Sequence, residues 1–146
     1  MAVTVKKAVL WRKEVDNRPG VLASTLAPLA EARADLKVVM GYRFPGMESQ
    51  GAIEVYPVSG KKVTDAASAA GLQASAIPTL VVEGDNRPGL GHAVAEAIAE
   101  EGINLSFVLV QVMGRRYSAV FGFENDSDAT RAAGLIKKAT SARAKR

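Results

Sequence analysis

Residues 16–20 read Asp-Asn-Arg-Pro-Gly, and residues 85–89 repeat these five residues without change. An apolar stretch rich in β-branched residues precedes each copy of the motif. A run with apolar residues at helical spacing follows each copy, over residues 21–34 and 90–101. The repeated unit is therefore predicted to be a strand, a tight turn and a helix.

The residue types in the motif suit the start of a helix that presents unpaired backbone N–H groups. Proline is expected at the first helical position, where its missing N–H costs nothing. The neighbouring glycine has no Cβ, so backbone or a ligand can approach closely. The N–H groups at a helix start, together with the positive end of the helix dipole, can hold a carboxylate or a phosphate. The alternative is that the motif is only a favourable turn and cap.

The internal repetition extends beyond the motif. Asp16 of the first copy corresponds to Asp85 of the second, and Leu36 matches Leu105 at the same offset. Further along, Asp65 matches Asp128 at a smaller offset. The shrinking offset places extra residues of the first copy in its connections, where insertions are tolerated. We therefore expect a duplicated domain, with domains over residues 1–78 and 79–146 and a basic tail over residues 141–146.

Each half contains the same predicted order of elements. Glycine and proline separate further runs that are typical of strands or helices. Second strands are expected over 36–40 and 105–110, third strands over 52–56 and 118–123, second helices over 64–70 and 126–133, and a short fourth strand over 74–77; residues 135–140 fit either a fourth strand or more helix. The order βαββαβ, written twice, predicts an α+β fold with two ferredoxin-like repeats, each an antiparallel sheet with its helices on one face.

Composition excludes several functional classes. The 146 residues are 48% hydrophobic but contain no uninterrupted apolar run long enough for a membrane-spanning helix, so none is expected. Without cysteine and with His92 as the only histidine, metal and cofactor sites are not expected. No nucleophile or phosphate-loop motif is present, so we expect no enzyme activity. The N-terminus lacks the pattern of a signal peptide, which favours a cytoplasmic protein.

The net charge of +4 raises nucleic acid as a possible partner. Much of the excess lies at the C-terminal end, which is typical of a solvated tail. Only 5% of the residues are aromatic, and no aromatic-rich RNA-recognition motif is present. Nucleic-acid binding is therefore the weaker alternative.

The motif and its surroundings resemble the ACT domain, the small-molecule regulatory module of amino-acid metabolism. In the second copy the resemblance lies in residues 85–90 followed by Gly102-Ile103-Asn104, and in the first copy in residues 16–22 followed by Asp35-Leu36. It covers about residues 9–140 and is greatest to small stand-alone proteins built from two ACT domains. The resemblance implies a regulatory, allosteric protein that binds an amino acid or related metabolite at ACT–ACT interfaces. An exposed sheet edge would favour a homodimer or higher homo-oligomer, and a regulated enzyme is expected as a further partner.

The resemblance places ligands on the turn between the first strand and the first helix of each repeat. The implied ligand-binding residues are Asp16, Asn17, Arg18, Pro19, Gly20, Val21 and Leu22 in the first copy and Asp85, Asn86, Arg87, Pro88, Gly89, Leu90, Gly91, His92 and Asn104 in the second. The chain departs from the family pattern in two places. Arg33-Ala34-Asp35 replaces the usual Gly-Ile-Asn, and Gly91-His92 replaces the usual Leu-Ala, so the two sites are expected to differ.

The expected chemistry is that of an amino acid. Helix N–H groups would hold its carboxylate, and Asp16 or Asp85 would hold its ammonium group. Alternatively, each aspartate pairs with its neighbouring arginine or caps its own turn. The motif arginines are either anion clamps or solvated surface residues. The remaining alternative is a structural interaction module whose turns bind nothing.

Overall fold

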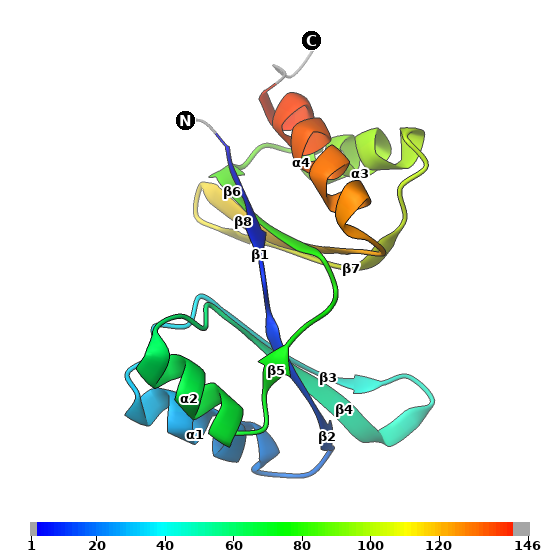
Figure 1. Ribbon diagram of the computed structural model, residues 1–146. Helices are drawn as coiled ribbons and strands as arrows, with labels where there is room; N and C mark the ends of the chain where they lie inside the picture. The colour runs from blue at the N-terminus through cyan, green and yellow to red at the C-terminus, as the bar shows by residue number, and fades with distance from the viewer. Residues whose placement is uncertain (1–2, 142–146) are drawn as a thin grey trace. The chain divides into compact units, whose positions relative to one another are not determined.

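The computed structural model describes residues 3–141 (Figure 1). The chain divides into two compact units. The first-repeat unit is Val9–Ala76, and the second-repeat unit combines Ile77 onward with the N-terminal segment up to Ala8. Each unit has its own antiparallel four-stranded sheet and its own hydrophobic core.

The first-repeat unit has the predicted order βαββαβ. Its elements are β2 (Trp11–Asp16), α1 (Val21–Glu31), β3 (Val38–Phe44), β4 (Met47–Tyr56), α2 (Lys61–Ala69) and β5 (Gln73–Ala74). The strands lie in the order β3-β4-β2-β5, so β3 is an edge strand. Helices α1 and α2 cover one face of this sheet (Figure 1). The fold class expected from the sequence is confirmed here.

Strand alternation sorts the residues of the first-repeat unit onto two faces. The core contains Val15, Ile53 and Val55 from the strands, which pack against Leu29 and Leu72. Because successive side chains of a strand point to opposite faces, the residues between these strand positions lie on the face away from the helices.

The second-repeat unit has a different order of elements. Its elements are β1 (Thr4–Ala8), β6 (Thr79–Asp85), α3 (Leu90–Glu100), β7 (Leu105–Met113), β8 (Arg116–Phe123) and α4 (Asp126–Ser141). The strands lie in the order β1-β6-β8-β7, with β7 at an edge. Leu80, Val82 and Phe121 contribute to a core with Ile98 of α3 and Ile136 of α4. The helices of this unit also lie on one face of its sheet (Figure 1).

The source of the fourth strand in the second repeat differs from the sequence prediction. Residues 135–140, for which strand and helix both fitted, belong to α4. Strand β1 takes the place of the missing strand and pairs antiparallel with β6, from Thr4 opposite Glu83 to Ala8 opposite Thr79. Without β1, the backbone groups along this side of β6 would be unpaired. The predicted domains 1–78 and 79–146 therefore placed the N-terminal segment with the wrong repeat. The boundary between the repeats lies between residues 76 and 77, close to the predicted position.

Smaller differences concern the ends of elements. Strand β4 begins at Met47, ahead of the predicted start at position 52, and β5 has only two residues. Gly71, with φ of 88°, follows α2 as a left-handed cap, and α4 continues to Ser141, beyond the predicted end at position 133. The basic tail predicted over 141–146 lies outside the described residues from position 142 onward. Within residues 3–141, no helix is long and apolar enough to cross a membrane.

The packing of β1 gives a test of this arrangement. Val5 is partly buried against the core of the second-repeat unit, whereas the preceding Thr4 is exposed. We expect Val5→Asn to lower the free energy of unfolding by about 1–2 kcal/mol, because an amide replaces apolar contacts. Thr4→Asn is the matched control and should leave stability within about 0.5 kcal/mol of the wild type. Urea unfolding measures both, and equal effects of the two variants would contradict the role of β1.

Candidate functional site

The two copies of the motif form the same turn. Gly20 and Gly89 precede the helices with φ of 88° and 84°, in the left-handed region that favours glycine. Val21 N donates to Arg18 O at 3.3 Å, and Leu90 N donates to Arg87 O at 3.2 Å. The helices thus begin two residues after the prolines, so the expectation of proline at the first helical position is wrong.

The helix starts are uncapped by side chains. Neither α1 nor α3 has a side-chain hydrogen bond at its N-cap, and neither has an acidic residue in its first turn. The alternative that each motif aspartate caps its own turn is therefore not what the structure shows. The N–H groups of Val21 and Leu90 bond within the turns, so those of the next two residues of each helix are the ones available to an acceptor from outside.

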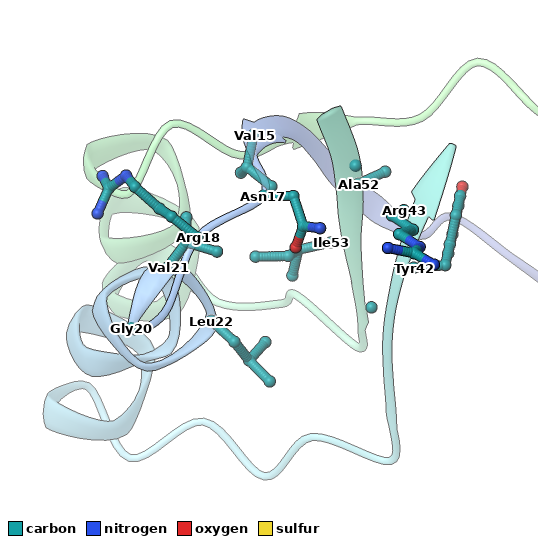
Figure 2. A pocket seen from close by; sticks show the side chains of 12 residues that line it. Val15, Asn17, Arg18, Gly20, Val21, Leu22, Tyr42, Arg43, Ala52 and Ile53 are labelled. Atoms are coloured by element: carbon teal, nitrogen blue, oxygen red, sulfur yellow. The ribbon is translucent and has the colours of Figure 1, made fainter. Parts of the chain in front are cut away.

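A cavity of about 350 Å³ adjoins the start of α1, and we call it the first-repeat pocket (Figure 2). The predicted residues that line it are Asn17, Arg18, Gly20, Val21 and Leu22. The remaining lining residues come from the three neighbouring strands: Val15 of β2, Gly41, Tyr42 and Arg43 of β3, and Gly51, Ala52 and Ile53 of β4. In Figure 2, Asn17 and Leu22 lie between α1 and the strands, whereas Arg18 extends away from them at the rim.

The corresponding second-repeat pocket is smaller, about 220 Å³, and almost wholly apolar. Three of the predicted residues line it: Asn86, Leu90 and Gly91. The other lining residues are Val94 and Ala95 of α3, Leu105, Val108 and Val110 of β7, and Tyr117, Ala119 and Phe121 of β8. The two repeats therefore place pockets at equivalent positions but give them different chemistry.

The motif aspartates lie outside both pockets. Val15 faces the core of its unit, so strand alternation directs Asp16 to the opposite face of the sheet. There Asp16 Oδ1 accepts a hydrogen bond from Gln50 Nε2 at 3.0 Å. Asp85 Oδ1 accepts one from Arg116 at 3.0 Å. Each aspartate is thus held by a residue of the adjacent strand rather than by the arginine of its own motif.

The motif arginines have different environments. The Arg87 guanidinium donates to the carbonyl oxygens of Ala139 and Thr140, both at 3.3 Å, near the end of α4. It thereby satisfies carbonyl groups that a helix end leaves unpaired. The Arg18 side chain has no hydrogen bond or ion pair within the described part of the chain, and Arg18 lines the first-repeat pocket.

The other predicted residues do not line the pockets. Pro19, Pro88 and Gly89 belong to the turns themselves, and His92 is exposed on α3. Asn104 donates from Nδ2 to a carboxylate oxygen of Glu124 at 2.9 Å. Ligand contact at these positions stays a prediction.

The strand residues of the first-repeat pocket were missed from the sequence, although two glycines within the sheet were a signal. Glycine inside a strand often marks a close approach of backbone or ligand. A Cβ at Gly51 would lie 2.5 Å from the carbonyl oxygen of Tyr42, so only glycine fits there. A Cβ at Gly41 would meet nothing within 4 Å, so this glycine leaves open space.

A buried carboxylate lies on the face of the first-repeat sheet away from the helices. The side chain of Glu54 is 1% exposed, and Oε2 accepts a hydrogen bond from the Tyr42 hydroxyl at 2.7 Å. The same oxygen lies 3.7 Å from Arg12 Nε. Burial raises the pKa of Tyr42 above its ordinary value of 10.0, and the interaction with Glu54 raises it further. The strand β3 that borders the pocket is thus tied to β2 and β4 by polar contacts.

Metal ligands are not grouped in the described residues: nowhere in 3–141 do three or more His, Asp or Glu side chains come together as a candidate ion site.

Solved structures similar to the whole chain include protein BT0572 from Bacteroides thetaiotaomicron, at 14% identity and a TM-score of 0.73, covering 93% of this chain and 90% of that one. The ligand-free regulatory subunit of aspartate kinase from Thermus thermophilus matches at 17% identity and a TM-score of 0.63, covering 95% and 97%. The corresponding subunit from Thermus flavus matches at 17% and 0.61, covering 96% and 97%. No protein-family model matches the sequence, and no match was found among curated proteins. These similarities confirm the fold that the resemblance to the ACT domain predicted.

The environment of Tyr42 predicts a pH dependence. Because its pKa is raised in the folded state, the folded chain holds the hydroxyl proton more tightly than the unfolded chain. The resulting stabilisation is complete below the ordinary pKa of 10.0 and is lost as the pH rises through the folded value. The difference in tyrosinate absorbance between the wild type and Tyr42→Phe reports the ionisation of Tyr42. We expect this difference to appear above pH 10.0. A titration at or below the ordinary value would contradict the burial of Tyr42 and its contact with Glu54.

Proposed function

We propose that this chain is a non-catalytic regulatory protein that binds an amino acid or related small metabolite at the helix starts and responds by changing its association. The observation that carries the proposal is the first-repeat pocket. It joins an uncapped helix start to a cavity of about 350 Å³, within the ~300–1,000 Å³ typical of ligand sites.

The chemistry of the turn supports binding of a carboxylate. Glycine at the N-cap leaves the first backbone N–H groups of α1 without a side-chain acceptor. Such groups and the helix dipole favour an anion. Leu22 is 43% exposed at the pocket and offers an apolar contact for the body of a small ligand. A bound metabolite would thus meet polar and apolar groups together.

The position of the pockets supports a link to association. Gly41, Tyr42 and Arg43 of the first-repeat pocket lie on β3, and Val108 and Val110 of the second-repeat pocket lie on β7. Both strands are edges of their sheets. A second copy added to either edge would therefore touch residues that line a pocket, and a ligand that contacts both copies would favour the assembly.

Strand β7 has the composition of an association surface. Five large apolar residues on this edge strand are 46–71% exposed: Val108, Leu109, Val110, Val112 and Met113. A long, apolar edge strand readily pairs with another chain unless it is covered. We propose a homodimer or higher homo-oligomer built on such an edge, a cytoplasmic location, and a regulated enzyme as a further partner. The likeness to regulatory subunits of aspartate kinase supports this regulatory role.

A thermal-shift screen against the twenty amino acids tests binding. At ten times its Kd, a ligand stabilises the folded chain by about 1.4 kcal/mol, which for a chain of this size raises Tm by ~3–6 °C. Two variants fill the pockets. Gly41→Val introduces into the first repeat the valine that the second repeat has at the equivalent position 110. Gly91→Leu introduces into the second repeat the leucine that the first repeat has at the equivalent position 22. A Cβ at either glycine meets nothing within 4 Å, so both variants should fold.

We expect at least one filling variant to abolish the shift, and the one that does so identifies the working pocket. Gly134→Val is the control, because Gly134 is exposed on α4 and a Cβ there also meets nothing within 4 Å. An unchanged Tm with every amino acid would overturn the proposed function.

The association surface is tested separately on β7. Leu109→Ser removes an exposed apolar side chain, whereas Gln111→Ser makes the same replacement at a polar position two residues along the same face. We expect Leu109→Ser to weaken self-association by about tenfold, equivalent to ~1.4 kcal/mol, and Gln111→Ser to leave it nearly unchanged. Sedimentation velocity over a concentration series measures both. Equal behaviour of the two variants would exclude β7 as the interface.

A further inference from the structure

The first-repeat pocket carries positive charge without a compensating negative one. Arg18 and Arg43 are its charged lining residues, and no aspartate or glutamate lines it. Neither arginine side chain has a hydrogen bond or an ion pair within residues 3–141. By contrast, Arg12, Arg116 and Arg131 each pair with a carboxylate. Unpaired guanidinium groups beside a cavity favour a bound anion, because guanidinium matches a carboxylate in both charge and geometry.

The second repeat provides an internal comparison. Arg43 lies opposite Gly51 in the first sheet, and Val112 lies opposite Tyr117 at the same position of the second sheet. Gly41 corresponds in the same way to Val110. The first repeat has therefore exchanged apolar side chains for open space and one cation.

We infer that the first-repeat pocket selects a small ligand with two carboxylates, and that Arg43 determines this selectivity. The inference rests on the proposed function and names the class of ligand that the first-repeat pocket would bind. One carboxylate is received by the N–H groups at the start of α1, and the second is paired with Arg43 on the opposite wall. Arg18, at the rim, adds to the attraction without being required for the contact (Figure 2).

The same geometry disfavours cationic ligands and makes an ammonium group unnecessary. Asp16, the one acidic residue of the motif, lies on the other face of the sheet with Gln50. A ligand ammonium would therefore find no carboxylate among the lining side chains. A dicarboxylate without an amino group should bind about as well as the amino acid of the same length, and lysine should be rejected by like charge.

Isothermal titration with matched ligands tests the inference. L-Aspartate and L-asparagine have nearly the same shape and differ by one charge, and succinate lacks the ammonium group of aspartate. We expect aspartate and succinate to bind at least about fivefold more tightly than asparagine, as one partly exposed charge-assisted contact allows. The longer pair, L-glutamate and L-glutamine, should show the same order if the pocket admits the extra methylene. L-Lysine is the cationic probe.

Two charge-removing variants locate the effect. Arg43→Gln should reduce the preference for aspartate over asparagine to about twofold or less. Lys62→Gln removes a positive charge from an exposed position of α2 in the same unit and should keep the preference. The preference should also fall as salt is added, because salt screens partly exposed charges.

The outcomes separate this inference from the proposed function. If asparagine or another neutral amino acid binds as tightly as aspartate, or if Lys62→Gln weakens the preference as much as Arg43→Gln does, the selectivity is overturned while binding stands. If none of these compounds binds and the amino-acid screen is also silent, the proposed function itself fails.

Discussion

The left-handed glycine between strand and helix is the constraint on which both repeats depend. With φ of 88° and 84°, Gly20 and Gly89 turn the chain from the first strand of each repeat into its first helix. A side chain at such a position is strained, and a serine or aspartate cap would occupy the helix N–H groups instead. The glycine therefore fixes the direction of the helix across the sheet and leaves its start open, so the same residue serves the fold and the pocket.

The sequence predicted the strand-turn-helix units, the fold class and the helix-start residues of the pockets, because these depend on local chemistry and on repetition within the chain. It did not predict β1, whose pairing with β6 joins positions far apart in the chain, such as Thr4 and Glu83. Nor did it predict the strand wall of the first-repeat pocket, because cross-strand register brings Gly41 and Arg43 to α1. Asp16 was misplaced for a related reason: motif membership does not say which face of the strand a residue occupies.

The two pockets differ because large and small side chains have changed places between neighbouring strands. In the second repeat, Tyr117 lies over Gly84, where a Cβ would approach the ring and hydroxyl to 2.9 Å. The equivalent pair in the first repeat is Gly51 beside Val15, so the larger side chain has moved to the other strand. Close packing requires such exchanges to be made together, since a single change leaves a void or a clash. The smaller apolar pocket and the larger basic one are thus two solutions to packing the same backbone.

The location of these differences bears on how a duplicated domain can acquire two functions. Most of the exchanged residues lie on the edge strands β3 and β7 or on β4 and β8 beside them, while the turn itself is unchanged. An edge strand has a neighbour on one side only, so its side chains are less constrained by the core than those of central strands. Arg43 and Val112 occupy equivalent edge positions with opposite chemistry. The two repeats share the same open helix start but differ at the edge strand. Such a change at the edge would alter what each pocket accepts and what surface it offers to a partner, without altering the turn.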